Sequence, residues 1–245
     1  NHLDCCLEEL AATTDEPAVI YIDRYTNQEM KQVYSNIKTI PKKSIQINTE
    51  NIQAVGNGIC VLLKLSSGVD GHVPDLILEA SAKDRIEEIL ETKSHMAWIG
   101  RMDNLMLIER AIETLPFLGL HKENKTKMIC LCAKHFENVA GILSIENSSV
   151  SIGDVKKLVL CDYAVGILPK IRFREENEME ILALSLIFCA RNAEISKTKN
   201  NSIWVGKVGS LRLEGHAIQT LPKLRIHEEN VMEELVLSVS YEHIT

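Results

Sequence analysis

The sequence predicts an α/β solenoid, in which short parallel strands form one face and short helices or coil form the other. Three series of residues recur at intervals of 53 residues. They are the glycines Gly100, Gly153 and Gly206, the Leu-Pro pairs at 115–116, 168–169 and 221–222, and the asparagines Asn124, Asn177 and Asn230. Because three independent markers share one interval, we interpret residues 76–245 as 53-residue tandem repeats.

Each unit contains two short L-x-L segments that we interpret as strands. One series begins at Leu76, Ile129, Leu182 and Leu235, and the other at Leu105, Leu158 and Leu211. The spacing alternates between 29 residues (Leu76 to Leu105) and 24 residues (Leu105 to Ile129), so the unit is a doublet. An apolar residue three positions earlier, such as Met102 or Val155, extends the pattern to φ-x-x-L-x-L.

This pattern resembles the leucine-rich repeat family, whose units have 20–29 residues. The resemblance covers residues 70–245 and extends more weakly over 18–70, through Ile20/Ile22 and the stretch 44–47. The family usually places Asn after L-x-L as a backbone-bonding ladder, whereas this chain has Arg110, Tyr163 and His216 there. We therefore expect another group to satisfy the backbone at these turns. A β-solenoid is the alternative fold.

The segments between the strands differ in the two halves of the doublet. Apolar residues at 86, 89 and 90 fit one helical face after the first strand, and Val139, Ile142 and Leu143 repeat it. The third copy, 192–196, retains only Ile195 and predicts a shorter helix. In the other half, the Leu-Pro pair limits the segment to one turn of helix or coil.

The two ends of the chain depart from the regular pattern. Residues 1–17 place Leu3, Cys6, Leu7 and Leu10 on one helical face, which predicts an N-terminal cap. Residues 18–75 are interpreted as degenerate repeats with an insertion at about 56–71, which forms an extra helix or strand. The C-terminal unit lacks a polar capping repeat, so we expect a truncated array.

The composition is that of a folded soluble protein, with 45% hydrophobic residues, 25% charged residues and a net charge of −7. Nucleic-acid binding needs clustered Lys and Arg, which are absent, so no nucleic-acid partner is expected. The longest apolar stretch, 59–65, is much shorter than the ~20 residues of a membrane span. We find no catalytic or phosphate-binding motif, and predict a protein that is not an enzyme and has no cofactor or metal.

The seven cysteines are odd in number, contain no C-x-x-C pair and do not recur with the repeat. This usage predicts reduced thiols and a cytoplasmic location. Glycosylation-type triplets at Asn124, Asn147 and Asn200 leave a secreted or extracellular location open. We interpret Cys130 and Cys132 as facing opposite sides of their strand, and therefore as core filler rather than metal ligands.

The residue between the two leucines of each strand should point to the opposite face of the sheet, because strand side chains alternate. We call these positions the x row: Tyr21, Gln46, Ile77, Met106, Cys130, Val159, Ala183, Arg212 and Val236. An exposed apolar row of this size marks an interaction site. We predict partner binding at Ile77, Met106, Cys130, Val159, Ala183, Arg212 and Val236, centred on Met106, Val159 and Arg212. The alternative is a sheet covered on both faces.

The function predicted is a protein-protein interaction module that binds a partner protein or peptide. Two alternatives remain open. The array is the substrate-recognition part of a larger enzyme such as a ubiquitin ligase, or it is a structural array that self-associates end to end.

Overall fold

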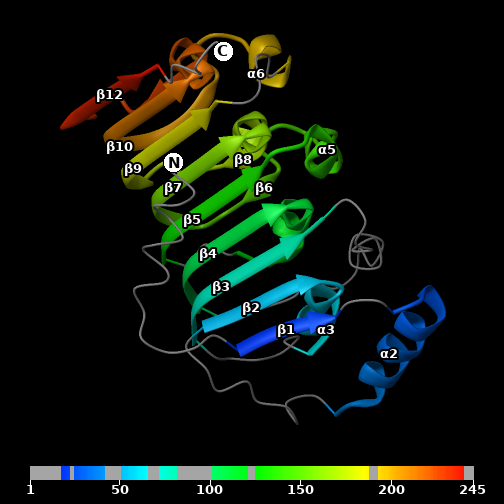
Figure 1. Ribbon diagram of the computed structural model, residues 1–245. Helices are drawn as coiled ribbons and strands as arrows, with labels where there is room; N and C mark the ends of the chain where they lie inside the picture. The colour runs from blue at the N-terminus through cyan, green and yellow to red at the C-terminus, as the bar shows by residue number, and fades with distance from the viewer. Residues whose placement is uncertain are drawn as a thin grey trace.

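The computed structural model describes residues 18–22, 25–41, 51–65, 72–81, 101–120, 125–187 and 193–239. The protein is an α/β protein, as predicted, with a ten-stranded parallel sheet and few helices (Figure 1). The main strands pair in the order β1 (Ala18–Ile22), β2 (Asn51–Gly56), β3 (His72–Ala80), β4 (Arg101–Glu109), β5 (Lys125–Ala133), β7 (Asp154–Asp162), β9 (Glu178–Leu186), β10 (Ile203–Gly215) and β12 (Glu234–Ser238).

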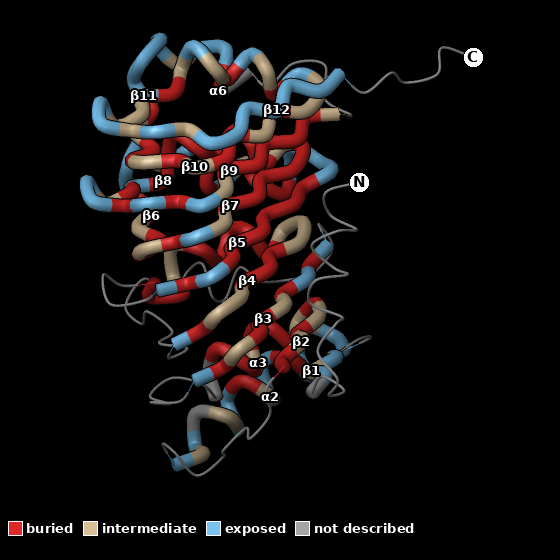
Figure 2. Tube along the Cα trace, turned by 90° about the vertical axis from the view of Figure 1, so that its left-hand side faces the viewer, coloured by how far each residue is buried: buried red, intermediate tan, exposed pale blue. Residues whose placement is uncertain are grey.

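Three short strands pair away from the main row of strands. The first residues of β10 pair with β11 (Leu224–Ile226), while β6 (Val150–Ser151) and β8 (Ile171–Arg172) form a separate two-stranded sheet. Figure 2 shows β6, β8 and β11 along one side of the molecule.

The predicted L-x-L strands from Leu76 onwards are confirmed, and their leucines pair in register. Consecutive strands join Leu76 to Leu105, Leu105 to Ile129, Ile129 to Leu158, Leu158 to Leu182, Leu182 to Leu211 and Leu211 to Leu235. Equivalent leucines therefore form two parallel rows across the sheet.

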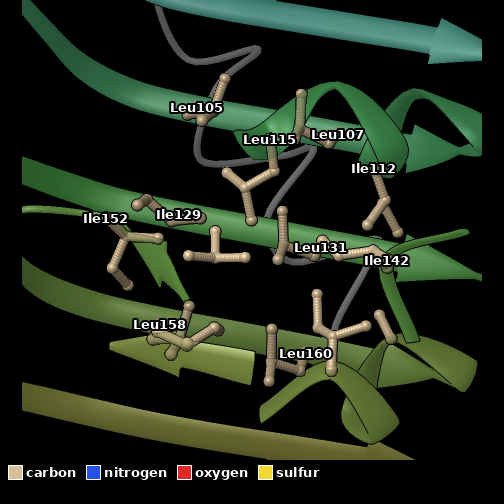
Figure 3. Packing of buried hydrophobic residues seen from close by; sticks show 14 of the residues in the cluster. Leu105, Leu107, Ile112, Leu115, Ile129, Leu131, Ile142, Ile152, Leu158 and Leu160 are labelled. Atoms are coloured by element: carbon tan, nitrogen blue, oxygen red, sulfur yellow. The ribbon is translucent and has the colours of Figure 1, made fainter. Parts of the chain in front are cut away.

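These two rows form the main core, together with the apolar residues that follow each strand. Figure 3 shows Leu105 and Leu107 above Ile129 and Leu131, with Ile112 and Leu115 packed beside them. The four strand residues have no exposed surface. Burying a side chain of this size stabilises a fold by about 1.5–3 kcal/mol, so the repeated rows are the main source of stability.

Short helices connect the strands on the side of this core. The Leu-Pro segments form the 3-10 helices η1 (Arg110–Phe117), η3 (Tyr163–Lys170) and η4 (His216–Lys223), each with the proline in its last turn. The longer halves form η2 (Phe136–Asn138) with α5 (Ala140–Leu143), and α6 (Ala193–Lys197). The helix expected at 83–91 lies outside the described residues.

The N-terminal strands differ from the expected arrangement. The stretch 44–47 lies outside the described residues, and the second strand is β2, where Ile52 pairs with Leu76. That step is 76 − 52 = 24 residues, the same as from Leu105 to Ile129, so no insertion is needed between β2 and β3. The apolar run after it forms α3 (Gly58–Leu65), which occupies the place of a normal connection.

Helix α2 (Asn27–Thr39) joins β1 to β2 and buries Met30 and Tyr34 in the main core. It begins with a capping box, in which the Thr26 hydroxyl accepts the Glu29 N–H and the Glu29 carboxylate accepts the Thr26 N–H. The expected cap at 1–17 lies outside the described residues.

Two of the sequence markers have direct structural roles. Gly153 and Gly206 have φ angles of 73° and 78°, in the left-handed region that glycine adopts at little cost. The side-chain oxygens of Asn177 and Asn230 accept the backbone N–H groups of Val155 and Val208, at 3.3 and 2.6 Å. These asparagines bond the backbone ahead of the L-x-L segments of β7 and β10, at the opposite end from the turns at Tyr163 and His216.

Candidate functional site

Five residues of the x row, Ile77, Met106, Cys130, Val159 and Ala183, belong to a second apolar cluster on the other face of the sheet. Its buried members are Met106, Met128, Cys130, Cys132, Val159, Cys161 and Ala183, with Ile77, Ile108 and Ile181 packed beside them. All ten residues belong to strands, and none of the described helices contributes. The sequence therefore identified residues that do lie together, with sulfur atoms prominent among them.

The centre of the x row is not accessible to a partner in this structure. Met106 and Cys130 have no exposed surface, while Val159 is 1% and Ala183 is 2% exposed. These values fit the alternative of a sheet covered on both faces. Met106 and Val159 therefore cannot be the centre of an open binding surface.

The ends of the x row are accessible. Ile77 and Arg212 are half-buried, and Val236 is exposed. The assignment of Tyr21 to the x row is wrong, because Val19 is the residue of β1 that pairs with Gln53. Tyr21 is exposed two residues further along the same face. Gln46 lies outside the described residues, and Gln53 of β2 occupies the equivalent position, opposite Ile77. A partner that binds this face has direct access to the two ends rather than to the middle.

The last two strands carry a polar network on this face. The Glu234 carboxylate accepts hydrogen bonds from the Ser210 hydroxyl at 2.6 Å and from the Arg212 guanidinium at 3.0 Å. These two donors hold the pKa of Glu234 below its ordinary value. Next to them, the Ser185 hydroxyl donates to Glu214. This face of the sheet thus changes from apolar at its centre to partly charged at β10 and β12.

The expectation that Cys130 and Cys132 face opposite sides of β5 is wrong. Residues two apart in a strand point to the same face, and both belong to the second cluster with Cys161. Cys132 pairs directly with Cys161 of β7. The contact with the Cys161 thiol, together with burial, raises the pKa of Cys132, while contact with the Cys130 thiol, together with burial, raises the pKa of Cys161. Both thiols therefore stay protonated, in the form that is least nucleophilic.

An open groove of about 600 Å³ lies on the side of the molecule formed by β8, β10 and β11. Its lining includes Arg172 and Phe173 from one repeat, and Trp204, Arg225 and His227 from the next. The arginines are exposed, Trp204 and His227 are half-buried, and Phe173 is buried. Aromatic walls and cationic donors therefore meet in one depression.

Trp204 contacts Arg174, Arg225 and His227 in this region. Its indole N–H donates to the Arg174 carbonyl at 3.4 Å, and the Arg225 guanidinium lies 5.0 Å from the ring centroid. The His227 ring packs edge to face against the indole at 5.9 Å. His227 Nδ1 accepts the Glu229 N–H at 3.1 Å, which leaves Nε2 to carry the ring proton.

The groove was not among the predicted sites, although the repeat register contains a signal for it. Arg172 and Arg225 are 53 residues apart, as are Glu175 and Glu228 at the rim. At two other equivalent positions the repeats diverge, because Ser151 is replaced by Trp204, and Arg174 by His227. Aligning the repeats for shared and divergent surface residues identifies these positions.

Within the described part of the chain, no group of three or more His, Cys, Asp or Glu side chains is arranged to hold a metal ion. None of the helices in those same segments has the length and apolar character needed to span a membrane. No protein-family model, curated protein or solved structure matches this chain.

Proposed function

We propose that this protein is an interaction module, a leucine-rich-repeat-like solenoid that binds a partner protein or peptide along the x-row face. The observation that carries the proposal is the in-register pairing of equivalent L-x-L strands from β3 to β12. Stacked repeats extend a surface in one direction, and such surfaces typically bind other macromolecules.

The accessible ends of the x-row face are where binding should be tested. Tyr21 and Val236 are exposed, and Arg212 is half-buried in its pair with Glu234. Aromatic residues and arginine are enriched at the energetic centres of protein interfaces. Substitution of Met106 or Val159 by a charged residue, in contrast, tests folding, because both are buried.

The experiment is affinity capture with the Tyr21→Ala, Arg212→Ala and Val236→Glu variants, followed by reconstitution with the purified partner. We expect direct binding by the wild type and affinity at least tenfold weaker for one of these variants with an unchanged melting temperature. The Lys156→Ala variant is the control, because Lys156 is an exposed residue of β7 that does not belong to the x row. The proposal fails if no purified protein binds, or if the Tyr21, Arg212 and Val236 variants bind as well as the control.

A second candidate is end-to-end self-association, and exposed leucines of β12 favour it. Leu235 and Leu237 are 50% and 46% exposed, although their equivalents Leu182 and Leu184 are fully buried. Light scattering tests this candidate, since the average mass of a stacking array rises with protein concentration. A mass that stays at the monomer value at high concentration contradicts it, as does a Leu235→Glu variant that assembles like the wild type.

A further inference from the structure

The groove between β8 and β11 contains two arginines that have no anionic partner in the described part of the chain. Among the described residues Arg172 and Arg225 form no ion pair, whereas Arg174 is bonded to Asp154 at 2.8 Å. Both arginines are exposed and keep their full hydrogen-bonding capacity. A guanidinium presents a planar fork of donors that matches a carboxylate.

The Arg225 guanidinium is held in place before any ligand binds. It stacks over Trp204, whose indole is fixed in turn by its bond to the Arg174 carbonyl. When a guanidinium stacks on an aromatic ring, its N–H groups lie in the guanidinium plane and remain free to donate. Because the side chain is already ordered, less conformational entropy is lost on binding.

The spacing of the two arginines indicates a ligand with separated charges. They are repeat equivalents, two strand levels apart, and each level adds about 4.8 Å, so their backbones lie about 10 Å apart. A single phosphate group needs donors that converge on one point. An extended peptide presents a side chain to the same side about every 7 Å, a spacing that the Arg172 side chain can match while Arg225 stays stacked on Trp204.

The rest of the lining favours a peptide of mixed character. Phe173 and Trp204 provide apolar walls, and Glu175 and Glu228 place carboxylates at the rim. These two carboxylates repel a chain in which every residue is acidic, and the net charge of −7 also opposes a polyanion such as nucleic acid. The best match is a segment in which acidic and apolar side chains alternate.

We propose that this groove binds an extended acidic segment of a partner protein, with Arg172 and Arg225 each receiving a carboxylate and Trp204 positioning Arg225. The site is separate from the x row, so the failure of either proposal leaves the other intact. His227 presents its Nε2 side as a further donor beside Trp204.

Fluorescence anisotropy with a labelled peptide of alternating glutamate and valine tests the site. We expect this peptide to bind the full chain, and its glutamine counterpart to bind at least tenfold more weakly. Arg172→Gln and Arg225→Gln should each weaken binding about tenfold or more, as for a lost hydrogen bond to a charged group. Arg101→Gln, at an exposed arginine at the start of β4, is the matched control and should bind like the wild type.

Trp204 variants separate positioning from a general effect on the fold. Trp204→Ser introduces the residue that the preceding repeat has at 151 and should weaken binding, while Trp204→Phe should restore part of it through stacking. The proposal is overturned if the glutamine peptide binds equally, or if the Arg172 and Arg225 variants bind like the control. It is also overturned if a labelled oligothymidylate binds more tightly than the peptide with the same dependence on both arginines.

Discussion

Two consecutive repeats, residues 125–177 and 178–230, are alike inside and different outside. Leu131 and Leu184 are equivalent and equally buried. At the surface, Asp154 and Arg174 form an ion pair in the first repeat, whereas the second has Lys207 and His227 in these places. Inward positions are constrained by neighbours on both sides, so they remain alike. Outward positions face solvent and can differ between repeats, and the groove includes positions at which the two repeats differ.

The largest difference between interior and terminal positions should come from the leucine row. Leu184→Ala leaves a cavity between β7 and β10 and should lower the free energy of unfolding by about 2–5 kcal/mol. Its equivalent Leu237 is 46% exposed, so Leu237→Ala should cost less than about 1 kcal/mol. Urea unfolding measures both, and equal losses would show that β12 is packed as tightly as β9.

The asparagines that bond the strand backbone provide the next comparison. Asn177→Ala leaves the Val155 N–H buried without its acceptor and should cost about 1–3 kcal/mol. Asn230→Ala should cost less, because Asn230 is half-buried and water can reach the Val208 N–H. Urea unfolding tests this ranking, and a larger loss of unfolding free energy for Asn230→Ala than for Asn177→Ala would contradict it.

A third comparison concerns two glycines of β10. An alanine Cβ at 206 would lie 2.4 Å from the Asn177 carbonyl oxygen, at a φ of 78°. The left-handed backbone alone makes Gly206→Ala cost about 1–2 kcal/mol or more. At 209 the nearest contact is 3.2 Å, to the Glu180 carbonyl oxygen, so Gly209→Ala should be milder. Thermal melts of the two variants should rank them in this order, and a milder Gly206→Ala would contradict the close approach.

The surface ion pair should have a smaller effect. Arg174→His copies the second repeat into the first and removes the bond to Asp154, both partners being about one-third exposed. Such pairs contribute about 0.2–1 kcal/mol. A double-mutant cycle with Asp154→Asn measures the coupling in 0.1 M salt, and a coupling above that range would show a stronger role for this pair.

The smallest effect concerns Glu234, whose equivalent in the preceding repeat is Ile181. Its pKa is lowered by Ser210 and Arg212 in the folded state, so this stabilisation is present above the ordinary carboxyl pKa and is lost as the pH falls through the folded value. We expect an NMR titration of Glu234 to show a midpoint below that of an ordinary glutamate, and Arg212→Gln to raise it. An unchanged midpoint would mean that Arg212 does not contribute.

The local pattern predicted the L-x-L strands β3, β4, β5, β7, β9, β10 and β12, and missed β2. Residues 51–55 resemble 217–221, which form η4, yet they form a strand because Ile52 pairs with Leu76. Local sequence is ambiguous for a short apolar run, and pairing with a distant strand decides its structure. The groove was missed for a related reason, since Arg172 and Trp204 come together only through stacking of the repeats.

The sequence by itself determined the 53-residue interval, the alternation of 29 and 24 residues, and the paired leucines that face the main core. These follow from local periodicity, because each unit repeats the same inward-facing positions along the chain. The tertiary structure decided which surfaces are accessible. Side chains alternate along a strand in the same way whether the second face of the sheet is open or covered. The burial of Met106 and Val159 therefore depends on atoms distant in the chain. The accessible candidates are therefore the ends of the x row and the groove beside Trp204.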